Sequence, residues 1–295
     1  MRLAHFSDVH ITHCPLSGGF ALKRLAAVAS YSLAGRGRHF AGSDARLAAL
    51  LADVDAQAVD HALCTGDLTG VSTEAEFQVV SEVFGERLHQ PRRFTCLPGN
   101  HDRYVSGATG LFEHHFGELC EGGTFPLVKA LDEHVTLVGL DVSRPTSLID
   151  SSGRVGEEQR KKLLDIVSDT SLRSRFVILA LHYGLLRSSG RRDVRSHGLR
   201  DDLELVGLVD RDDIWVDLVV HGHMHRPFVV QTRRRHVINP GSATDLHVKR
   251  CGYHVYEIDP RAYAVHVSRR EWNPATGAYV QAPDSPLAQR FVTRA

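Results

Sequence analysis

The sequence predicts one α/β domain built on two packed β-sheets. In the first part of its 295 residues, short apolar runs typical of strands alternate with segments of helical periodicity. After about residue 210, short strand-like runs dominate, and turn sequences such as Asn239-Pro240-Gly241-Ser242 separate them. Alternating strands and helices are typical of sheets covered by helices. We expect residues 1–270 to form the domain and residues 271–295, which contain three prolines, to form an irregular tail.

Composition excludes several classes of protein. Hydrophobic residues make up 42% and charged residues 24%, as in ordinary globular proteins. The formal net charge is zero, so we expect no specific binding of nucleic acid. No apolar run approaches the roughly 18 residues of a transmembrane helix, and no signal peptide pattern begins the chain. The five cysteines lack C-x-x-C spacing, which favours reduced thiols and a cytoplasmic location.

The first half of the chain contains three predicted strands and two predicted helices. The strands cover residues 2–6, 59–65 and 94–97. A helix over 45–54 has Ser43 as a candidate N-cap. Another over 73–88 has Ser72 or Thr73 as its cap, with Glu76 in its first turn. Residues 103–134 suggest mixed loop and short helix.

The second half is predicted to be mostly strands. One amphipathic helix is expected over 157–167. The expected strands cover residues 135–141, 176–181, 214–220, 228–232, 235–238, 252–258 and 262–268. The triplet 233–235 is expected at a hairpin tip.

A basic segment over residues 18–42 differs from its surroundings because residues 11–43 contain no acidic side chain. Apolar residues such as Phe20, Leu25 and Leu33 are close to helical spacing, which indicates a basic amphipathic helix followed by a glycine-broken loop. Its basic residues are Lys23, Arg24, Arg36 and Arg38. Two interpretations stay open: a packed helix with a solvated edge, or a surface that meets a lipid or an anionic substrate.

The strand expected over 214–220 is followed by His221-Gly222-His223-Met224-His225. Imidazole is the commonest protein ligand of metals, and Gly222 allows a sharp turn. This loop is therefore half of a candidate metal site.

Polar side chains follow other predicted strands in the same way. The full set of strand-end residues is Asp8, His10, Asp67, Asn100, His182, His223 and His225. In open α/β sheets, ligands bind at the carboxyl ends of strands. Nitrogen and oxygen donors without thiolates suit Mn, Fe, Zn or Co. Seven donors are too many for one open catalytic ion, and they suit two ions about 3.5–4 Å apart.

Five motifs occur in order: D-x-H (Asp8, His10), G-D-x-x-G (66–70), G-N-H-D (99–102), a single histidine (His182) and G-H-x-H (222–225). Over roughly residues 1–270 the chain resembles the calcineurin-like metallophosphoesterase superfamily. The resemblance implies a four-layer αββα sandwich, with two mixed sheets flanked by helices, and a binuclear metal centre.

The resemblance also implies roles for single residues. Asp8, His10 and His225 would bind one ion, and Asn100, His182 and His223 the other. Asp67 would bridge the two ions. His101 would be catalytic and Asp102 would orient it, while Asn100, His101 and Arg103 would contact the substrate. Relatives often have a second histidine after His182, where this chain has Tyr183; His221 is expected to be only a strand-end residue.

Loop order and length most resemble the class III cyclic-nucleotide phosphodiesterases. The basic segment resembles the UDP-diacylglucosamine pyrophosphohydrolases of lipid A synthesis, which would imply a lipid-linked substrate and peripheral contact with the inner membrane. The reaction expected is in-line attack on phosphorus by a hydroxide shared between two divalent ions, with Mn serving in vitro. His101 would donate a proton to the leaving oxygen of a small phosphate ester or nucleotide.

The motifs are also compatible with a phosphomonoesterase, a nuclease or a non-catalytic scaffold, although the complete set of motifs disfavours the scaffold. The arginine-rich loop over 187–200 could add anion contacts or be a solvated basic loop.

Overall fold

The computed structural model describes residues 1–12, 36–147, 149–246, 251–282 and 289–294. The amphipathic helix expected within residues 18–42 therefore lies mostly outside the described residues. Only its end is described, where helix α2 (Arg36–Phe40) replaces the expected loop.

The first sheet has the strand order β12-β11-β10-β1-β2-β3, and β13 also pairs with β11. Strands β1, β2 and β3 are parallel to one another, while β10 runs antiparallel to β1. The bounds are β1 Arg2–Phe6, β2 His61–Cys64, β3 Phe94–Cys96, β10 Gly252–Asp259, β11 Ala264–Asn273, β12 Ala278–Gln281 and β13 Arg290–Val292.

The second sheet has the order β4-β5-β6-β7-β9-β8. Strands β5, β6, β7 and β9 are parallel, and the edge strands β4 and β8 are antiparallel to their neighbours. The bounds are β4 Leu127–Ala130, β5 Val135–Gly139, β6 Phe176–Ala180, β7 Leu218–Val220, β8 Pro227–Gln231 and β9 His236–Pro240. Both sheets are mixed, as predicted.

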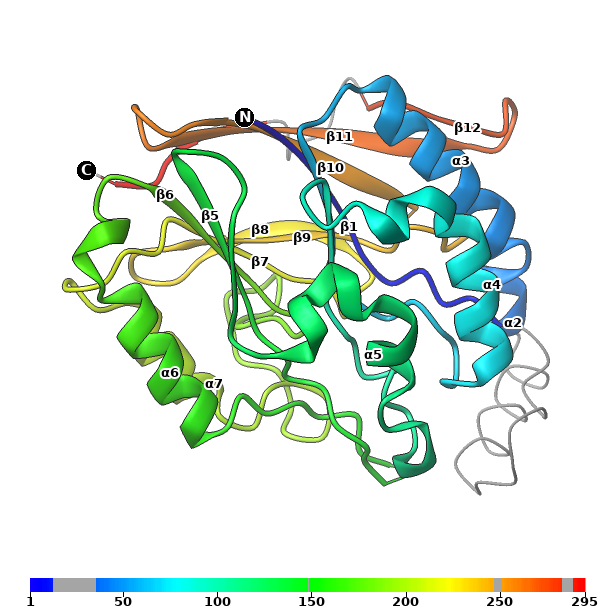
Figure 1. The fold of residues 1–295 in the computed structure, drawn as a ribbon, viewed down its shortest axis with the longest axis horizontal. Helices are drawn as coiled ribbons and strands as arrows, with labels where there is room; N and C mark the ends of the chain where they lie inside the picture. Colours follow the sequence, from blue (N-terminus) through cyan, green and yellow to red (C-terminus); the bar gives the residue numbers. More distant parts are fainter. Residues whose placement is uncertain (13–35, 148, 247–250, 283–288, 295) are drawn as a thin grey trace.

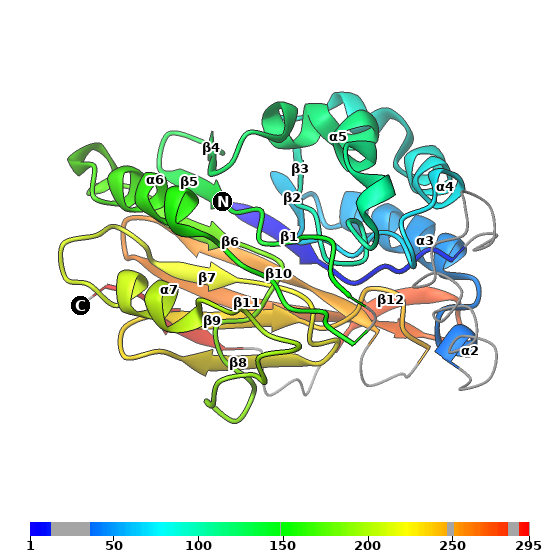
Figure 2. The same cartoon turned by 90° about the horizontal axis from the view of Figure 1, so that it is seen from below.

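Helices cover the outer face of each sheet (Figures 1 and 2). Helices α3 (Ser43–Ala56), α4 (Glu74–Phe84) and α5 (Leu111–Phe116) lie over the first sheet. Helices α6 (Glu157–Val167) and α7 (Asp202–Val209) lie over the second. Helix α4 begins in a capping box, because Thr73 accepts from the amide of Glu76 and the Glu76 carboxylate accepts from the amide of Thr73.

Apolar side chains fill the space between the two sheets. Leu3 and Leu63 of the first sheet lie in one buried cluster with Ile178 and Leu218 of the second. Two further clusters join each sheet to its helices. The predicted arrangement of two mixed sheets flanked by helices is therefore confirmed, and the parallel strands of both sheets bring their carboxyl ends to one region.

The expectation of an irregular tail after residue 270 is wrong. Strand β11 continues to Asn273, and β12 returns along it after a turn at residues 274–277. Strand β13 pairs with the other end of β11. Tyr279 and Phe291 are buried, so both short strands contribute to the core.

An ion pair fixes the segment after β13. Both oxygens of the buried Asp217 carboxylate lie 2.6 Å from nitrogens of Arg294. The same guanidinium donates to the carbonyls of Arg173 and Arg175 and lies 4.3 Å from the ring centroid of Tyr263. Arg294 therefore joins β13 to the entry of β7.

No helix among the described residues is both long and apolar enough to cross a bilayer.

Candidate metal centre

All seven predicted ligands lie at the carboxyl ends of strands, and the two sheets bring them together. Asp8 and His10 follow β1, Asp67 follows β2 and Asn100 follows β3. His182 follows β6, and the loop that carries His223 and His225 follows β7. Six of the seven are buried, and the side chain of His225 is 21% exposed.

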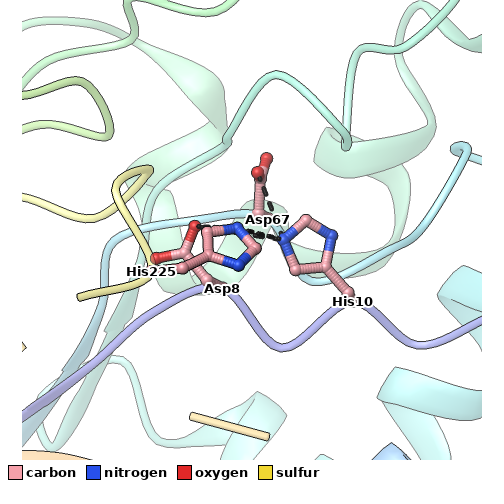
Figure 3. Close-up of side chains that lie close together, drawn as sticks. All are labelled: Asp8, His10, Asp67 and His225. Carbon is pink, nitrogen blue, oxygen red and sulfur yellow. Dashed lines mark hydrogen bonds and ion pairs between the residues drawn. The ribbon is translucent and has the colours of Figure 1, made fainter. Parts of the chain in front are cut away.

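The first group consists of Asp8, His10, Asp67 and His225, whose donor atoms lie within 4.8 Å of one another (Figure 3). The Nε2 atoms of His10 and His225 are 3.0 Å apart. His225 Nε2 lies 3.4 Å from Asp8 Oδ1, and His10 Nε2 lies 3.6 Å from Asp67 Oδ2. Two imidazole nitrogens and two carboxylates that converge in this way form a donor set for one cation.

The second group consists of Asp67, His182 and His223. His182 Nε2 lies 3.3 Å from Asp67 Oδ2 and 3.1 Å from Asn100 Oδ1, so the amide of Asn100 joins this group. Asp67 belongs to both groups, and the same oxygen faces both. This is the position in which a carboxylate can bridge two ions.

Backbone carbonyls select the tautomer of two histidines. His182 donates from Nδ1 to the carbonyl of Thr65 at 2.7 Å, which leaves Nε2 as the ring atom that faces Asp67. His223 donates from Nε2 to the carbonyl of His197 at 3.0 Å, which leaves Nδ1 as its donor atom. Metal-binding histidines are commonly held in this way by a hydrogen bond at the other nitrogen.

The backbone is strained at the ligands. Among the described residues, nine that are not glycine have positive φ, and five of these nine are predicted ligands. They are Asp8, His10, Asp67, His223 and His225, with φ between 51° and 69°. Such conformations are uncommon and cluster at functional sites because the surrounding structure must impose them.

Two glycines allow the loops to approach one another. A Cβ atom at Gly222 would lie 1.9 Å from Ser7 Oγ and 2.9 Å from Asp8 Oδ2. A Cβ atom at Gly99 would lie 2.2 Å from Asp67 Oδ1. Gly222 therefore serves close approach of two loops, rather than the sharp turn expected from the sequence.

The protonation states of three histidines fit metal binding, whereas Asp67 and Asp8 outweigh burial and raise the pKa of His182 to about 9. Burial lowers the pKa of His225 to about 4, and burial with neighbouring histidines lowers the pKa of His10 and His223 well below the usual range of an imidazole, so these three rings are neutral near pH 7. Neutral imidazole is the form that binds a metal. Burial raises the pKa of Asp8 to about 7, whereas His182 and His101 outweigh burial and lower the pKa of Asp67. Burying two carboxylates together is costly without cations, so the residues present fit divalent ions.

His10 and His225 are covered by Phe40, whose ring centroid lies 4.8 Å and 5.9 Å from theirs. Phe40 lies near the C-terminal end of the segment 18–42, so this part of the segment lies beside the first group. Because Phe40 is buried, it shields the group from water.

A cavity of about 300 Å³ opens beside the two groups. Ligands Asp67, Asn100, His223 and His225 line it together with His101. The other lining residues are Tyr104, Ile149, Asp150, Ser151 and His197.

His101 lies against the first group, with its ring centroid 4.7 Å from that of His10. Its amide donates to Asp67 Oδ1 at 2.7 Å, and its Nδ1 donates to the carbonyl of Gly70 at 2.5 Å. The carboxylate of Asp102, expected to orient the His101 ring, accepts from the amides of Thr69 and Gly99. Asp102 therefore holds the loops that carry His101, and Gly70 holds the ring.

Three other residues named in the sequence analysis lie outside the described cavity lining. Arg103 is absent from the described cavity lining, because its guanidinium pairs with Asp141 at 2.7 Å and with Glu113. Tyr183 is fully buried and donates to the carbonyl of Ser151 at 2.5 Å, so it supports the wall rather than lining the cavity. His221 is buried beneath the site, as expected for a strand-end residue, and packs on Phe228.

Most arginines of the loop 187–200 pair with carboxylates of the protein. Arg187 pairs with Asp193, Arg192 with Asp202 and Arg200 with Asp150. These ion pairs favour the interpretation of residues 187–200 as a solvated basic loop over the interpretation in which the loop adds anion contacts. Sequence reasoning missed Tyr104, His197 and the segment 149–151 in the cavity lining. His197 and the segment 149–151 carry no motif and reach the site only through tertiary contacts.

Comparison with known proteins supports the same interpretation. The model of the calcineurin-like phosphoesterase family matches residues 1–227. No protein with a curated description matches the sequence.

Solved structures share the fold. A dimetal phosphatase from Danio rerio has a TM-score of 0.65 and 10% identity, over 95% of this chain and 98% of that one. A purple acid phosphatase from yellow lupin (Lupinus luteus) seeds has a TM-score of 0.54 and 13% identity, over 95% of this chain and 52% of that one. GAP50, the anchor in the inner membrane complex of Plasmodium, has a TM-score of 0.53 and 11% identity, over 100% of this chain and 88% of that one. With its fold, its grouped donors and a family match over most of its length, the chain belongs to the calcineurin-like phosphoesterases.

Proposed function

We propose that the chain is a phosphodiesterase that works with two divalent ions. Asp8, His10 and His225 would bind one ion, and Asn100, His182 and His223 the other, with Asp67 between them. The two donor groups that share Asp67 support this assignment. When bound, the ions would neutralise phosphoryl charge and supply a nucleophilic water at neutral pH.

The preference for a diester rests on the charge of the cavity. None of the described residues that line it is a lysine or an arginine, and Asp150 adds a carboxylate at its wall. Burial raises the pKa of Asp150, but hydrogen bonds from Ser152 and Arg200 outweigh this and lower it, so the group is ionised at pH 7. A diester carries one negative charge, whereas a monoester or a diphosphate carries about two or more, and the described lining offers no lysine or arginine to pair with the extra charge.

His101 is the residue placed to act on the leaving group. It flanks the first donor group and lines the cavity. Its Nδ1 donates to the carbonyl of Gly70, which fixes the orientation of the ring. In the imidazolium form, which carries a proton on each nitrogen, the ring would deliver the Nε2 proton to the leaving oxygen and keep Nδ1–H on Gly70; such proton transfer would accelerate cleavage by roughly 10²–10⁴-fold.

One observation favours a second candidate, a pyrophosphohydrolase acting on a nucleotide-linked lipid. The apolar side chain of Phe40, at the end of the segment 18–42, packs against the first group. An acyl chain held beside it would contribute about 0.8 kcal/mol for each buried CH₂. Substitution of Phe20, Leu25 and Leu33 by serine should then impair cleavage of an acylated diphosphate much more than that of a small diester.

A panel of substrates tests the proposal. The purified protein, saturated with Mn, would be given bis-p-nitrophenyl phosphate, p-nitrophenyl phosphate, a cyclic nucleotide and a UDP-linked diacyl sugar. We expect the highest kcat/KM with a diester, and Asp67→Asn as the control should abolish turnover. A higher kcat/KM with the monoester or the lipid-linked diphosphate would contradict the diesterase assignment.

A further inference from the structure

The loop 187–200 places one histidine in the wall of the cavity. His197 lines the cavity, and its side chain is 41% exposed. Its Nδ1 lies 2.7 Å from Oδ2 of Asp193, a carboxylate that is only 8% exposed. The other carboxylate oxygen accepts from Arg187 Nε at 2.7 Å. This buried carboxylate holds the His197 ring in one orientation.

The wall that carries His197 is anchored to a second loop. The amide of Ser151 donates to the carbonyl of Ser196 at 2.8 Å, and the amide of Gly153 donates to the carbonyl of Gly198 at 3.2 Å. Asp150 pairs with Arg200 across the same junction. These contacts fix the backbone on both sides of His197, as a residue that recognises a ligand requires.

His197 and His101 flank different donor groups. The ring centroid of His197 lies 4.2 Å from that of His223, in the second group, whereas His101 lies beside His10, in the first. A phosphoryl group that contacts both donor groups would therefore have His101 near one side and His197 near the other. In an in-line displacement the leaving group departs opposite the attacking oxygen, and the retained ester group points elsewhere.

The chemistry of the His197 ring follows from its partner. The Asp193 carboxylate accepts a hydrogen bond from Nδ1–H of His197, and in this tautomer Nε2 is the hydrogen-bond acceptor of the ring. Among the described residues, Nε2 has no hydrogen-bond partner, and Asp150 adds acceptor oxygens to the same cavity. Acceptors of this kind recognise a hydroxyl group.

We propose that His197 determines specificity by binding the ester group that stays on phosphorus, accepting a hydrogen bond from a hydroxyl of that group. This inference rests on the proposed diesterase function, because a monoester has no second organic group. The ligand class is a phosphodiester whose retained alcohol bears a further hydroxyl, as glycerol and ribose do.

Two matched diesters test this proposal: propyl p-nitrophenyl phosphate and 3-hydroxypropyl p-nitrophenyl phosphate. They share the leaving group and differ in one hydroxyl. We expect the Mn-loaded protein to prefer the hydroxylated diester by roughly 3- to 10-fold in kcat/KM, the effect of one hydrogen bond. His197→Ala should remove this preference and change the propyl diester little, whereas His197→Gln, which retains an acceptor, should restore part of it.

Further measurements separate recognition from support of the centre. Product inhibition should favour 3-hydroxypropyl phosphate over propyl phosphate, and His197→Ala should remove that difference as well. Metal content should be unchanged, because the carbonyl that orients His223 is retained in the variant. Val194→Ala, an exposed position in the same loop, is the control and should keep the preference.

Each contrary outcome has a distinct meaning. If the wild type cleaves both diesters equally, the role of His197 is wrong and the diesterase function stands. If His197→Ala loses metal, or loses activity equally on both diesters and on p-nitrophenyl phosphate, the side chain only supports the centre and the proposal is overturned. If the wild type cleaves p-nitrophenyl phosphate but neither diester, the diesterase function fails and the specificity proposal with it.

Discussion

Removal of the Arg294 guanidinium should strongly destabilise the fold, although it lies far along the chain from the metal centre. In Arg294→Ala, the fully buried carboxylate of Asp217 would lose two hydrogen bonds of 2.6 Å from a cation. It would keep the amide of Val177 at 2.8 Å and the hydroxyl of Thr293 at 3.3 Å. Breaking a buried ion pair in this way costs about 3–5 kcal/mol.

The same change should make stability depend on pH in a defined direction. Burial already raises the pKa of Asp217 even with Arg294 present, and the loss of Arg294 should raise it further. When the pKa of a carboxyl group is higher in the folded than in the unfolded state, the group stabilises the fold at pH values below its unfolded pKa of about 4. This stabilisation is lost as the pH rises through the pKa of the folded state. The variant should therefore differ from the wild type more at pH 8 than at pH 5.

Urea unfolding at pH 8 and pH 5 measures both effects, provided that the m-value is unchanged. The matched control is Arg211→Ala, which removes a pair with Asp213 of similar geometry at 2.8 and 2.6 Å, but on the surface. Exposed pairs contribute little, so the control should unfold like the wild type. An equal effect of the two substitutions, or a loss in Arg294→Ala that does not depend on pH, would refute the reasoning. Asp217→Asn combined with Arg294→Ala should recover part of the loss, because no buried charge then remains unpaired.

Three other predictions concern the centre and the core. Metal analysis of His101→Ala should show that both ions are retained. Its kcat should fall roughly 10²–10⁴-fold on diesters with poor leaving groups and much less on aryl diesters. Equal losses on both kinds of diester would contradict a leaving-group role. Asp67→Asn should bind fewer than two Mn ions per chain, and a full pair would contradict bridging. Burial lowers the pKa of His61 to about 4, so acid destabilises the fold as pH falls from about 6.5 to 4. His61→Gln should reduce the slope of unfolding free energy against pH there by up to about 1.4 kcal/mol per pH unit.

Much of the fold could be predicted because most strands are short apolar runs buried on both faces. The strand expected over 176–181 forms as Phe176–Ala180, and the helix expected over 157–167 has these same bounds. Helix α7 was missed because Asp202–Val209 is short and largely apolar, which gives little periodicity. Strands β4 and β12 were missed because each has only four residues and gains stability from its neighbour.

The grouping of the candidate ligands could be predicted because each follows a strand, and the sheet order brings the strand ends together. The residues that line the substrate side of the cavity could not be predicted, because their positions depend on how two loops without motifs pack together. His197 illustrates this, since its partner Asp193 lies in the same loop, but its ring packs on His223 and the adjacent carbonyl of Ser196 is held by the amide of Ser151. Arg103 illustrates the reverse: it is adjacent to a motif, but acidic residues distant in sequence hold it away from the cavity.

The pairing of β1 with β10 has a consequence for the synthesis of this protein. Leu3 pairs with Tyr256, so the centre of the first sheet joins the two ends of the described chain. At 5–20 residues per second, a ribosome would need roughly 12–50 s to produce β10 after β1. During that time the apolar side chains of Leu3 and Phe6, fully buried in the finished fold, would lack the strand that completes their sheet. The nascent chain should therefore depend on a chaperone that covers this edge, and truncation before β10 should leave aggregates rather than a smaller folded domain.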